Sequence, residues 1–160
     1  MSFLDDLNAG NPVDTSMAEA PSGMIRRSEV MQPMRIYVCG LLTAATVSER
    51  EQNIKVADDM GRALFLLGHV PFVPHTHSHT WFDHVDDYPE FQDYKRLVVD
   101  YDINGWLAVC DAIFCLEGWE RSKGGVMEYK AAQEMNRIFY YRNDQVPIVH
   151  GLGNDDFRYV

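Results

Sequence analysis

The chain has 160 residues, of which 46% are hydrophobic and 24% charged, and its formal net charge is −10. This composition is typical of one soluble globular domain with its own core. It argues against a nucleic-acid polymer as partner, because phosphate backbones bind clustered Lys and Arg, but a single nucleotide remains compatible. No stretch reaches the roughly 20 apolar residues of a membrane span, and no secretory leader opens the chain.

The three cysteines support a cytoplasmic location for the protein. Their number is odd, and each lies in an apolar stretch: Cys39, Cys110 and Cys115. Free, buried thiols in a reducing compartment fit this pattern better than disulfides or a cysteine-based zinc site.

The first half of the chain contains a leader, a strand, a helix and a second strand. Residues 1–33 lack periodicity and predict a flexible leader, with a short helix near residues 2–7. The domain is expected over residues 34–160, beginning with a buried strand at 35–40. Ser48 and Glu51 form the Ser-x-x-Glu pattern of a capping box, and Gly68 closes this helix. Residues 70–73 predict a second short strand, in which Pro71 and the following Pro74 indicate an edge position or strand ends.

The second half continues the alternation of helices and strands. Residues 75–90 predict a loop over the site, and residues 91–109 a helix that Gly105 interrupts. A buried strand is expected at 112–116, a helix at 125–136, a strand at 137–141 and one more at 146–149. This order predicts an α/β fold, a flavodoxin- or Rossmann-like three-layer sandwich with a mainly parallel sheet of about five strands.

The segment from Ser122 to Glu128 is the most informative part of the chain, because it follows a buried strand and contains two adjacent glycines. A strand, a glycine-rich turn and a helix build ligand sites at the carboxyl ends of parallel strands. Glycine lets the backbone approach a ligand, and the helix N-terminus offers free N–H groups. Glu128, in the first turn of that helix, would face the crevice. The alternative is that it only complements the helix dipole.

Two further groups fall near the same edge of the sheet. Tyr37, just before Gly40, would contact a ligand or pack between helix and sheet. Asp102 and Asn104 would orient a hydroxyl or a base of the substrate, or belong to a solvated helix face.

Alternating histidines follow the second strand, at positions 75, 77 and 79. On one face of an extended segment, three imidazoles could bind Zn²⁺. No nearby cysteine completes the set, so we favour a pocket-lining role for His75 or His77 and expect no metal.

Several short motifs together resemble the nucleoside 2-deoxyribosyltransferase superfamily, which includes the 2′-deoxynucleoside 5′-phosphate N-hydrolases. The resemblance covers residues 35–141. It depends on the order and spacing of Tyr37-Val38-Cys39-Gly40, Pro71-Phe72-Val73-Pro74-His75, Asp102-Ile103-Asn104-Gly105, Cys110-Asp111-Ala112 and Gly118-Trp119-Glu120-Arg121-Ser122-Lys123-Gly124 with Glu128.

The resemblance implies a role for each matching residue. Glu128 would be the nucleophile that forms a glycosyl ester with C1′ of a 2-deoxyribosyl group, and Asp102 would exchange a proton with the base. Tyr37 would orient Glu128, while Ser122 and Gly124 would hold the 5′ end of the sugar. Further contacts with the ligand are predicted for Gly40, His75 and Trp119. The family needs no metal or organic cofactor, and its members form homodimers or higher homo-oligomers.

Departures from the family bear on the substrate. Ser122 stands where transferases acting on free nucleosides tend to have Asp, which favours the nucleotide hydrolases. Those hydrolases, however, grip the 5′-phosphate with Ser and Arg after the first strand, where this chain has Leu41 and Thr43. Arg121 and Lys123 are candidates for the missing positive charge.

Two more features of the comparison concern the catalytic aspartate and the oligomer. The interval from Asp102 to Asp111 is one residue longer than in relatives, so Asp100 is a substitute candidate for the catalytic aspartate. In oligomers of the family, a neighbouring subunit often completes the site with residues near its C-terminus, here Asn154 or Tyr159.

The sequence therefore predicts an enzyme that cleaves the N-glycosidic bond of a 2′-deoxynucleoside 5′-monophosphate or deoxynucleoside. One alternative is a transferase that exchanges bases. Another is a nucleotide-binding module without turnover, and a third is a zinc hydrolase built on the histidines.

Overall fold

A computed structural model describes residues 31–87, 89 and 93–149, without the side chains of residues 79, 82, 83 and 85. The expected leader, its short helix, Asn154 and Tyr159 therefore lie outside the described residues, apart from residues 31–33.

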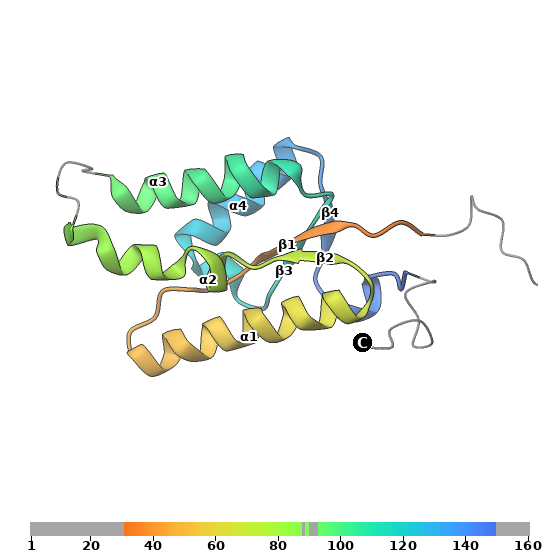
Figure 1. The fold of residues 1–160 in the computed structure, drawn as a ribbon, viewed down its shortest axis with the longest axis horizontal. Helices are drawn as coiled ribbons and strands as arrows, with labels where there is room; N and C mark the ends of the chain where they lie inside the picture. The colour runs from red at the N-terminus through yellow and green to blue at the C-terminus, as the bar shows by residue number, and fades with distance from the viewer. Residues whose placement is uncertain (1–30, 88, 90–92, 150–160) are drawn as a thin grey trace, which may run out of the picture.

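The described chain is an α/β fold around a parallel sheet, as the sequence predicted (Figure 1). The strands are β1 (Arg35–Cys39), β2 (Val70–Phe72), β3 (Ala112–Cys115) and β4 (Ile138–Tyr140), in the spatial order β2-β1-β3-β4. All three strand pairs are parallel, and β2 occupies the predicted edge position. Helix α1 (Val47–Leu66) covers one face, and α3 (Tyr94–Tyr101) and α4 (Lys123–Glu134) cover the other.

Alternation along the strands creates a core on each face of the sheet. Side chains at every second position point to the same face, so β1 sends Ile36 and Val38 towards α1 and Tyr37 and Cys39 towards α4. All three cysteines are buried and free, as predicted.

The N-cap of helix α1 lies two residues earlier than predicted. The capping box consists of Thr46 and Glu49, not Ser48 and Glu51: the Glu49 N–H donates to Thr46 Oγ1 at 3.2 Å, and the Thr46 N–H donates to the Glu49 carboxylate at 3.1 Å. Two overlapping Ser/Thr-x-x-Glu patterns stand in this stretch, and the first of them forms the cap.

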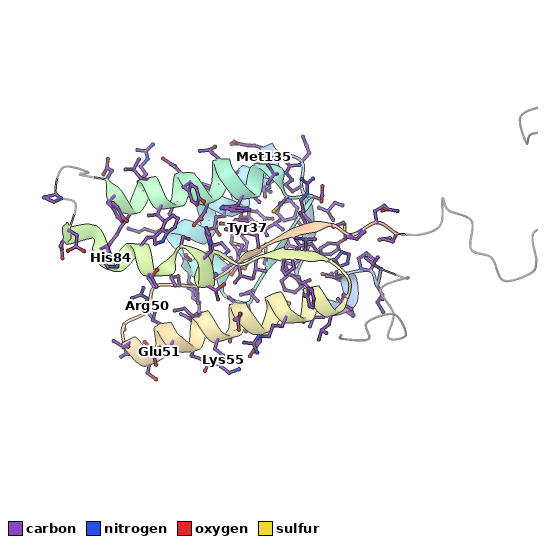
Figure 2. All side chains as sticks on the ribbon, in the orientation of Figure 1. Tyr37, Arg50, Glu51, Lys55, His84 and Met135 are labelled. Carbon is purple, nitrogen blue, oxygen red and sulfur yellow. The ribbon has the colours of Figure 1, made fainter. Side chains whose placement is uncertain are left out.

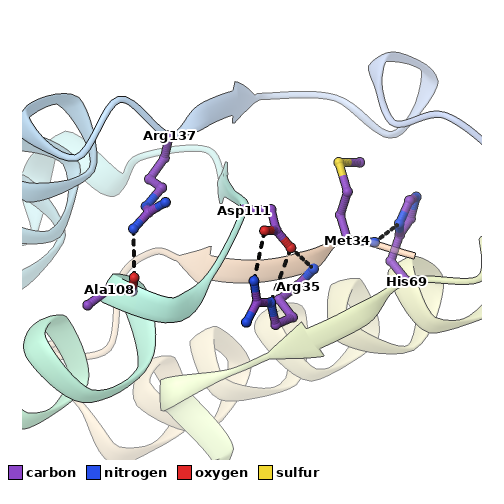
Figure 3. Close-up of polar contacts among 6 residues, drawn as sticks. All are labelled: Met34, Arg35, His69, Ala108, Asp111 and Arg137. Atoms are coloured by element: carbon purple, nitrogen blue, oxygen red, sulfur yellow. Dashed lines mark hydrogen bonds and ion pairs between the residues drawn. The ribbon is translucent and has the colours of Figure 1, made fainter. Parts of the chain in front are cut away.

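Charged side chains fasten the sheet at the end opposite the glycine-rich turn (Figure 3). Asp111 accepts hydrogen bonds from the backbone N–H of Arg35 at 2.8 Å and from its guanidinium at 3.0 and 3.2 Å. Arg137 donates to the carbonyl of Ala108 at 2.6 Å. These contacts tie β1 and β4 to the turn that leads into β3.

The strand expected at residues 146–149 is not formed. This segment is attached instead to the end of α1, where the Val149 N–H donates to the Leu67 carbonyl at 2.9 Å. The buried imidazole of His69 accepts from the Met34 N–H at Nδ1, 3.2 Å away, and lies 2.7 Å from the Pro147 carbonyl at Nε2. Its Nε2 therefore carries the proton and donates. These side-chain and loop contacts take the place of the hydrogen bonds that a fifth strand would form.

The described part of residues 75–90 is helical, so the predicted loop was wrong. A short helix, α2 (Pro74–His77), is followed by a 3₁₀-helix over His79–Asp87. Pro74 suits the first position of α2, because a backbone N–H at that position has no acceptor within the helix and proline carries none. Beyond α3, the chain forms a π-helical turn over Asp102–Trp106 that contains Gly105, where the sequence predicted an interruption.

Candidate active site

A pocket of about 350 Å³ opens at the carboxyl ends of β1 and β3. Its size lies within the roughly 300–1,000 Å³ of small-molecule sites. Six residues predicted to contact or act on a ligand line it together: Gly40, His75, Asp102, Ser122, Gly124 and Glu128. Segments far apart in the sequence therefore converge here. The pocket also includes residues that the sequence did not single out, namely Leu42, Ser78 and Val99.

The first turn of α4 forms one wall of the pocket. Ser122 is its N-cap, and Ser122 Oγ accepts a hydrogen bond from the Gly125 N–H at 3.1 Å. A side chain on Gly125 would place its Cβ 2.8 Å from the Trp119 carbonyl oxygen, so only glycine permits this close approach. The first N–H groups of a helix have no partner within it. Lys123 and Gly124, the first two residues of α4, both line the pocket.

Glu128 is buried, with 8% of its surface exposed. Helix α4 begins at Lys123, two residues earlier than predicted, so Glu128 lies in the second turn and not in the first. Its position does not fit the alternative of a solvated charge at the helix N-terminus. Burial raises the pKa of Glu128 to about 7, partly offset by hydrogen bonds from Cys39 and Tyr37.

Tyr37 lies in the core on the face of the sheet that α4 covers (Figure 2). It is fully buried and does not line the pocket. Its hydroxyl donates a hydrogen bond to Glu128 Oε1 at 3.0 Å. Burial raises the pKa of Tyr37 well above its usual range, and the nearby Glu128 charge adds to this. Tyr37 therefore stays protonated and fixes one carboxylate oxygen of Glu128.

Asp102 is the second buried carboxyl of the pocket, with 3% of its surface exposed, so it does not belong to a solvated face. Its Oδ2 lies 2.7 Å from Ser78 Oγ. Burial raises the pKa of Asp102 to about 6, against the opposing effects of the Ser78 hydrogen bond and of nearby His77. A pocket with two carboxyls of raised pKa is able to hold and release protons near neutral pH.

A π-helical turn lies within the interval from Asp102 to Asp111, where the resemblance led us to expect one additional residue. Such a turn closes hydrogen bonds five residues apart instead of four and so takes up an additional residue. Asp102 begins this turn and faces the pocket, whereas Asp100 lies outside the pocket lining and pairs with Arg96 at 3.6 Å. The structure therefore favours Asp102 over Asp100 as the carboxyl of the site.

The histidines occupy different surroundings. His75 is buried, lines the pocket, and its Nε2 lies 3.0 Å from the Leu41 carbonyl. His77 contacts a group of aromatic rings, with centroid distances of 5.3 Å to Phe72 and 5.5 Å to Trp81. The side chain of residue 79 lies outside the described residues. Within the described part of the chain, no three metal-ligating side chains gather into one site.

Two basic residues stand beside the Ser122 end of the pocket. Arg121 and Lys123 both line it, as does Thr43 in the segment after β1. The Arg121 guanidinium packs against Gly118 at the edge of this wall. The pocket lining therefore combines two basic residues and the start of α4 with the two buried carboxyls. This arrangement suits a ligand with an anionic group at one end.

Trp119 is not brought into this pocket. Its ring stacks on Tyr129 at a centroid distance of 4.1 Å and packs against the core on the α4 face of the sheet. The pattern around Trp119 gave no means of distinguishing a ligand contact from this packing role.

The fold and the site define an α/β domain with a small-molecule pocket that contains two buried carboxyls. The chain belongs to the family described as "Domain of unknown function (DUF4406)", whose model matches residues 34–141. A search of curated proteins found no match. Among the described residues, no helix combines the length and apolar character needed to cross a bilayer.

Proposed function

We propose that the protein cleaves the N-glycosidic bond of a 2′-deoxynucleoside 5′-monophosphate through a glycosyl ester on Glu128. The observation that carries this proposal is the pairing, in one pocket, of Glu128 held by Tyr37 with a second buried carboxyl, Asp102. A nucleophilic carboxylate and a proton-exchanging carboxyl are the two groups that glycoside cleavage by a covalent route requires.

In the first step, the free oxygen of the Glu128 carboxylate attacks C1′ as the bond from C1′ to the base nitrogen breaks. The electron pair of that bond stays on the nitrogen, which takes a proton from Asp102. Tyr37 holds the other oxygen of Glu128 at 3.0 Å and so directs the attack. The products of this step are the free base and a glycosyl ester.

In the second step, water attacks C1′ and gives a proton to Asp102, while the bond from C1′ to Glu128 breaks. The sugar phosphate leaves, and both carboxyls return to their initial states. A second base in place of water would give base exchange, which is the alternative activity as a transferase.

We favour the 5′-monophosphate over the nucleoside as substrate because basic residues line the pocket where α4 begins. Arg121 and Lys123 supply positive charge beside the first N–H groups of α4, in the place where the resemblance puts the 5′ end of the sugar. In this proposal, these two side chains bind the 5′-phosphate, which Ser and Arg after the first strand bind in the nucleotide hydrolases.

Base release from deoxynucleosides and their 5′-monophosphates tests the proposal, with and without a second free base. Glu128→Gln is compared with Glu134→Gln, an exposed glutamate of the same helix. We expect release from monophosphates by the wild type and by Glu134→Gln, and none by Glu128→Gln. Weaker activity on monophosphates, but not on nucleosides, is expected for the double variant Arg121→Ala, Lys123→Ala.

A nucleotide-binding module without turnover is the second candidate, because the segment after β1 lacks the phosphate-gripping residues of the hydrolases. Binding of nucleotides by folded wild type, with no base release from any member of the panel, would favour this candidate and exclude the enzyme.

A further inference from the structure

The hydroxyl of Ser78 faces two hydrogen-bond acceptors with a single proton. Ser78 follows α2 and has 1% of its surface exposed. Its Oγ lies 3.2 Å from the Pro74 carbonyl oxygen and 2.7 Å from Asp102 Oδ2. Because a hydroxyl carries one donor and two acceptor sites, it serves these two oxygens alternately.

The protonation state of Asp102 decides between the two arrangements. When Asp102 is ionised, Ser78 donates to Oδ2, and 2.7 Å is the distance of a charge-assisted hydrogen bond. When Oδ2 carries the proton, Asp102 donates to Ser78 Oγ, and the hydroxyl turns to the Pro74 carbonyl. The contact between Ser78 and Asp102 persists in both states, and only the donor changes.

Apart from the contact with Ser78, the Asp102 carboxyl has few polar interactions among the described residues. Its Oδ1 is buried and meets no hydrogen-bond partner among the described residues. The titratable groups that act on it or respond to it are His77 on α2, Glu128 on α4 and Tyr37 on β1. Ser78 is thus the hydrogen-bond donor that Asp102 meets within the described part of the chain.

We propose that Ser78 is a positioning residue that keeps Asp102 hydrogen-bonded while this carboxyl gives up and regains its proton during each turnover. The hydroxyl favours the ionised carboxylate, since a hydrogen bond to a charged group is stronger than one to a neutral group. This role rests on the proposed function, in which Asp102 first gives a proton to the base and later receives one from water.

The ¹³C resonance of the Asp102 carboxyl, assigned with Asp102→Asn and followed against pH, tests this role without any turnover. In Ser78→Ala the charge-assisted bond is lost, so we expect the acid ionisation constant of Asp102 to fall about tenfold. Ser78→Thr keeps the hydroxyl and should retain the wild-type titration. Thr76→Val is the matched control. The Thr76 hydroxyl donates to the carbonyl of Val73, the N-cap of α2, at 3.1 Å, and no carboxylate of the described residues accepts from it.

An unchanged titration in Ser78→Ala, or an equal shift in Thr76→Val, would overturn the proposal. If Ser78→Ala does not fold, Ser78→Cys replaces the hydroxyl by a weak donor of similar shape and is expected to shift the titration in the same direction. The pH profile of kcat/KM adds a second readout. A limb displaced to higher pH supports the positioning role, whereas a profile reduced equally at every pH indicates a structural role only.

The two proposals fail separately. If folded wild type releases no base, the proposed function is wrong, and the carboxyl titration still decides whether Ser78 controls Asp102. If wild type releases base and Ser78→Ala titrates as wild type does, the proposed function stands and the role of Ser78 is wrong.

Discussion

Replacing Glu128 by Gln should stabilise the protein above neutral pH, because the native fold holds this carboxyl where its ionised form is unfavourable. The pKa of Glu128 is raised from 4.5 to about 7, mainly by burial. The folded state therefore binds the proton more tightly than the unfolded chain, and unfolding releases a proton between these two pH values. The contribution of Glu128 to the free energy of unfolding has its full value below pH 4.5 and is lost as the pH rises through 7.

The magnitude follows from the size of the shift. At about 1.4 kcal/mol per pKa unit, ionisation of Glu128 costs about 3 kcal/mol of unfolding free energy once the pH is well above 7. Gln at this position is neutral at every pH and still accepts the hydrogen bond from Tyr37. Relative to wild type, Glu128→Gln should therefore gain stability as the pH rises from 5 to 8, by up to about 3 kcal/mol.

Urea unfolding at several pH values between 5 and 8 measures this difference. Glu134→Gln, which changes an exposed glutamate of the same helix, should show no such gain. A difference between Glu128→Gln and wild type that stays constant with pH would refute the reasoning, as would one that reverses in sign.

Three further predictions concern the same site. The kcat/KM for base release should fall on both sides of about pH 6.5, because activity needs Glu128 ionised and Asp102 protonated, with pKa values of about 7 and about 6; a flat profile between pH 5 and 8 would contradict this. Tyr37→Phe removes a hydrogen bond that lowers the pKa of Glu128, so the Glu128 carboxyl should titrate at higher pH in ¹³C spectra, and an unchanged titration would count against the orienting role. Gly125→Ala should lower the free energy of unfolding by about 1–3 kcal/mol, because its Cβ would meet the Trp119 carbonyl oxygen at 2.8 Å. Gly124→Ala is the control: its Cβ has only an ordinary contact at 3.8 Å, so this variant should unfold at nearly the same urea concentration as wild type.

The sequence predicted the order of strands and helices because each buried strand is a short apolar run bounded by Gly, Pro or Asp. It also indicated which loops would meet, since the carboxyl ends of parallel strands share one edge of a sheet. Glu128, Asp102 and Ser122 could be named in advance for this reason. That Tyr37 would contact Glu128 followed only from the resemblance to a family, because alternation places a residue on a face but does not name its partner.

Other features depended on tertiary contacts that local patterns do not encode. Residues 75–90 were predicted as a loop because they are rich in His, Asp and aromatic residues, yet their described part is helical. Ser78 had no signal of its own: its importance comes from Asp102, which lies 24 residues further along the chain. The only signal for the π-helical turn was the expected additional residue between Asp102 and Asp111, relative to the superfamily that the sequence resembles. Asp102, which begins this turn, lines the pocket, whereas Asp100 does not.

The most direct test of the central claim is mass spectrometry of the protein after incubation with a 2′-fluorinated deoxynucleoside 5′-monophosphate. The electron-withdrawing fluorine destabilises the oxocarbenium-like state of both steps. A base that leaves readily keeps the first step faster than the second, so with such a substrate a glycosyl ester should accumulate. We expect wild type and Glu134→Gln to release base and to carry the glycosyl phosphate on a peptide that contains Glu128, and Glu128→Gln to do neither. Base release without a gain in mass, or an equal gain in mass by Glu128→Gln, would contradict the assignment of Glu128 as the nucleophile.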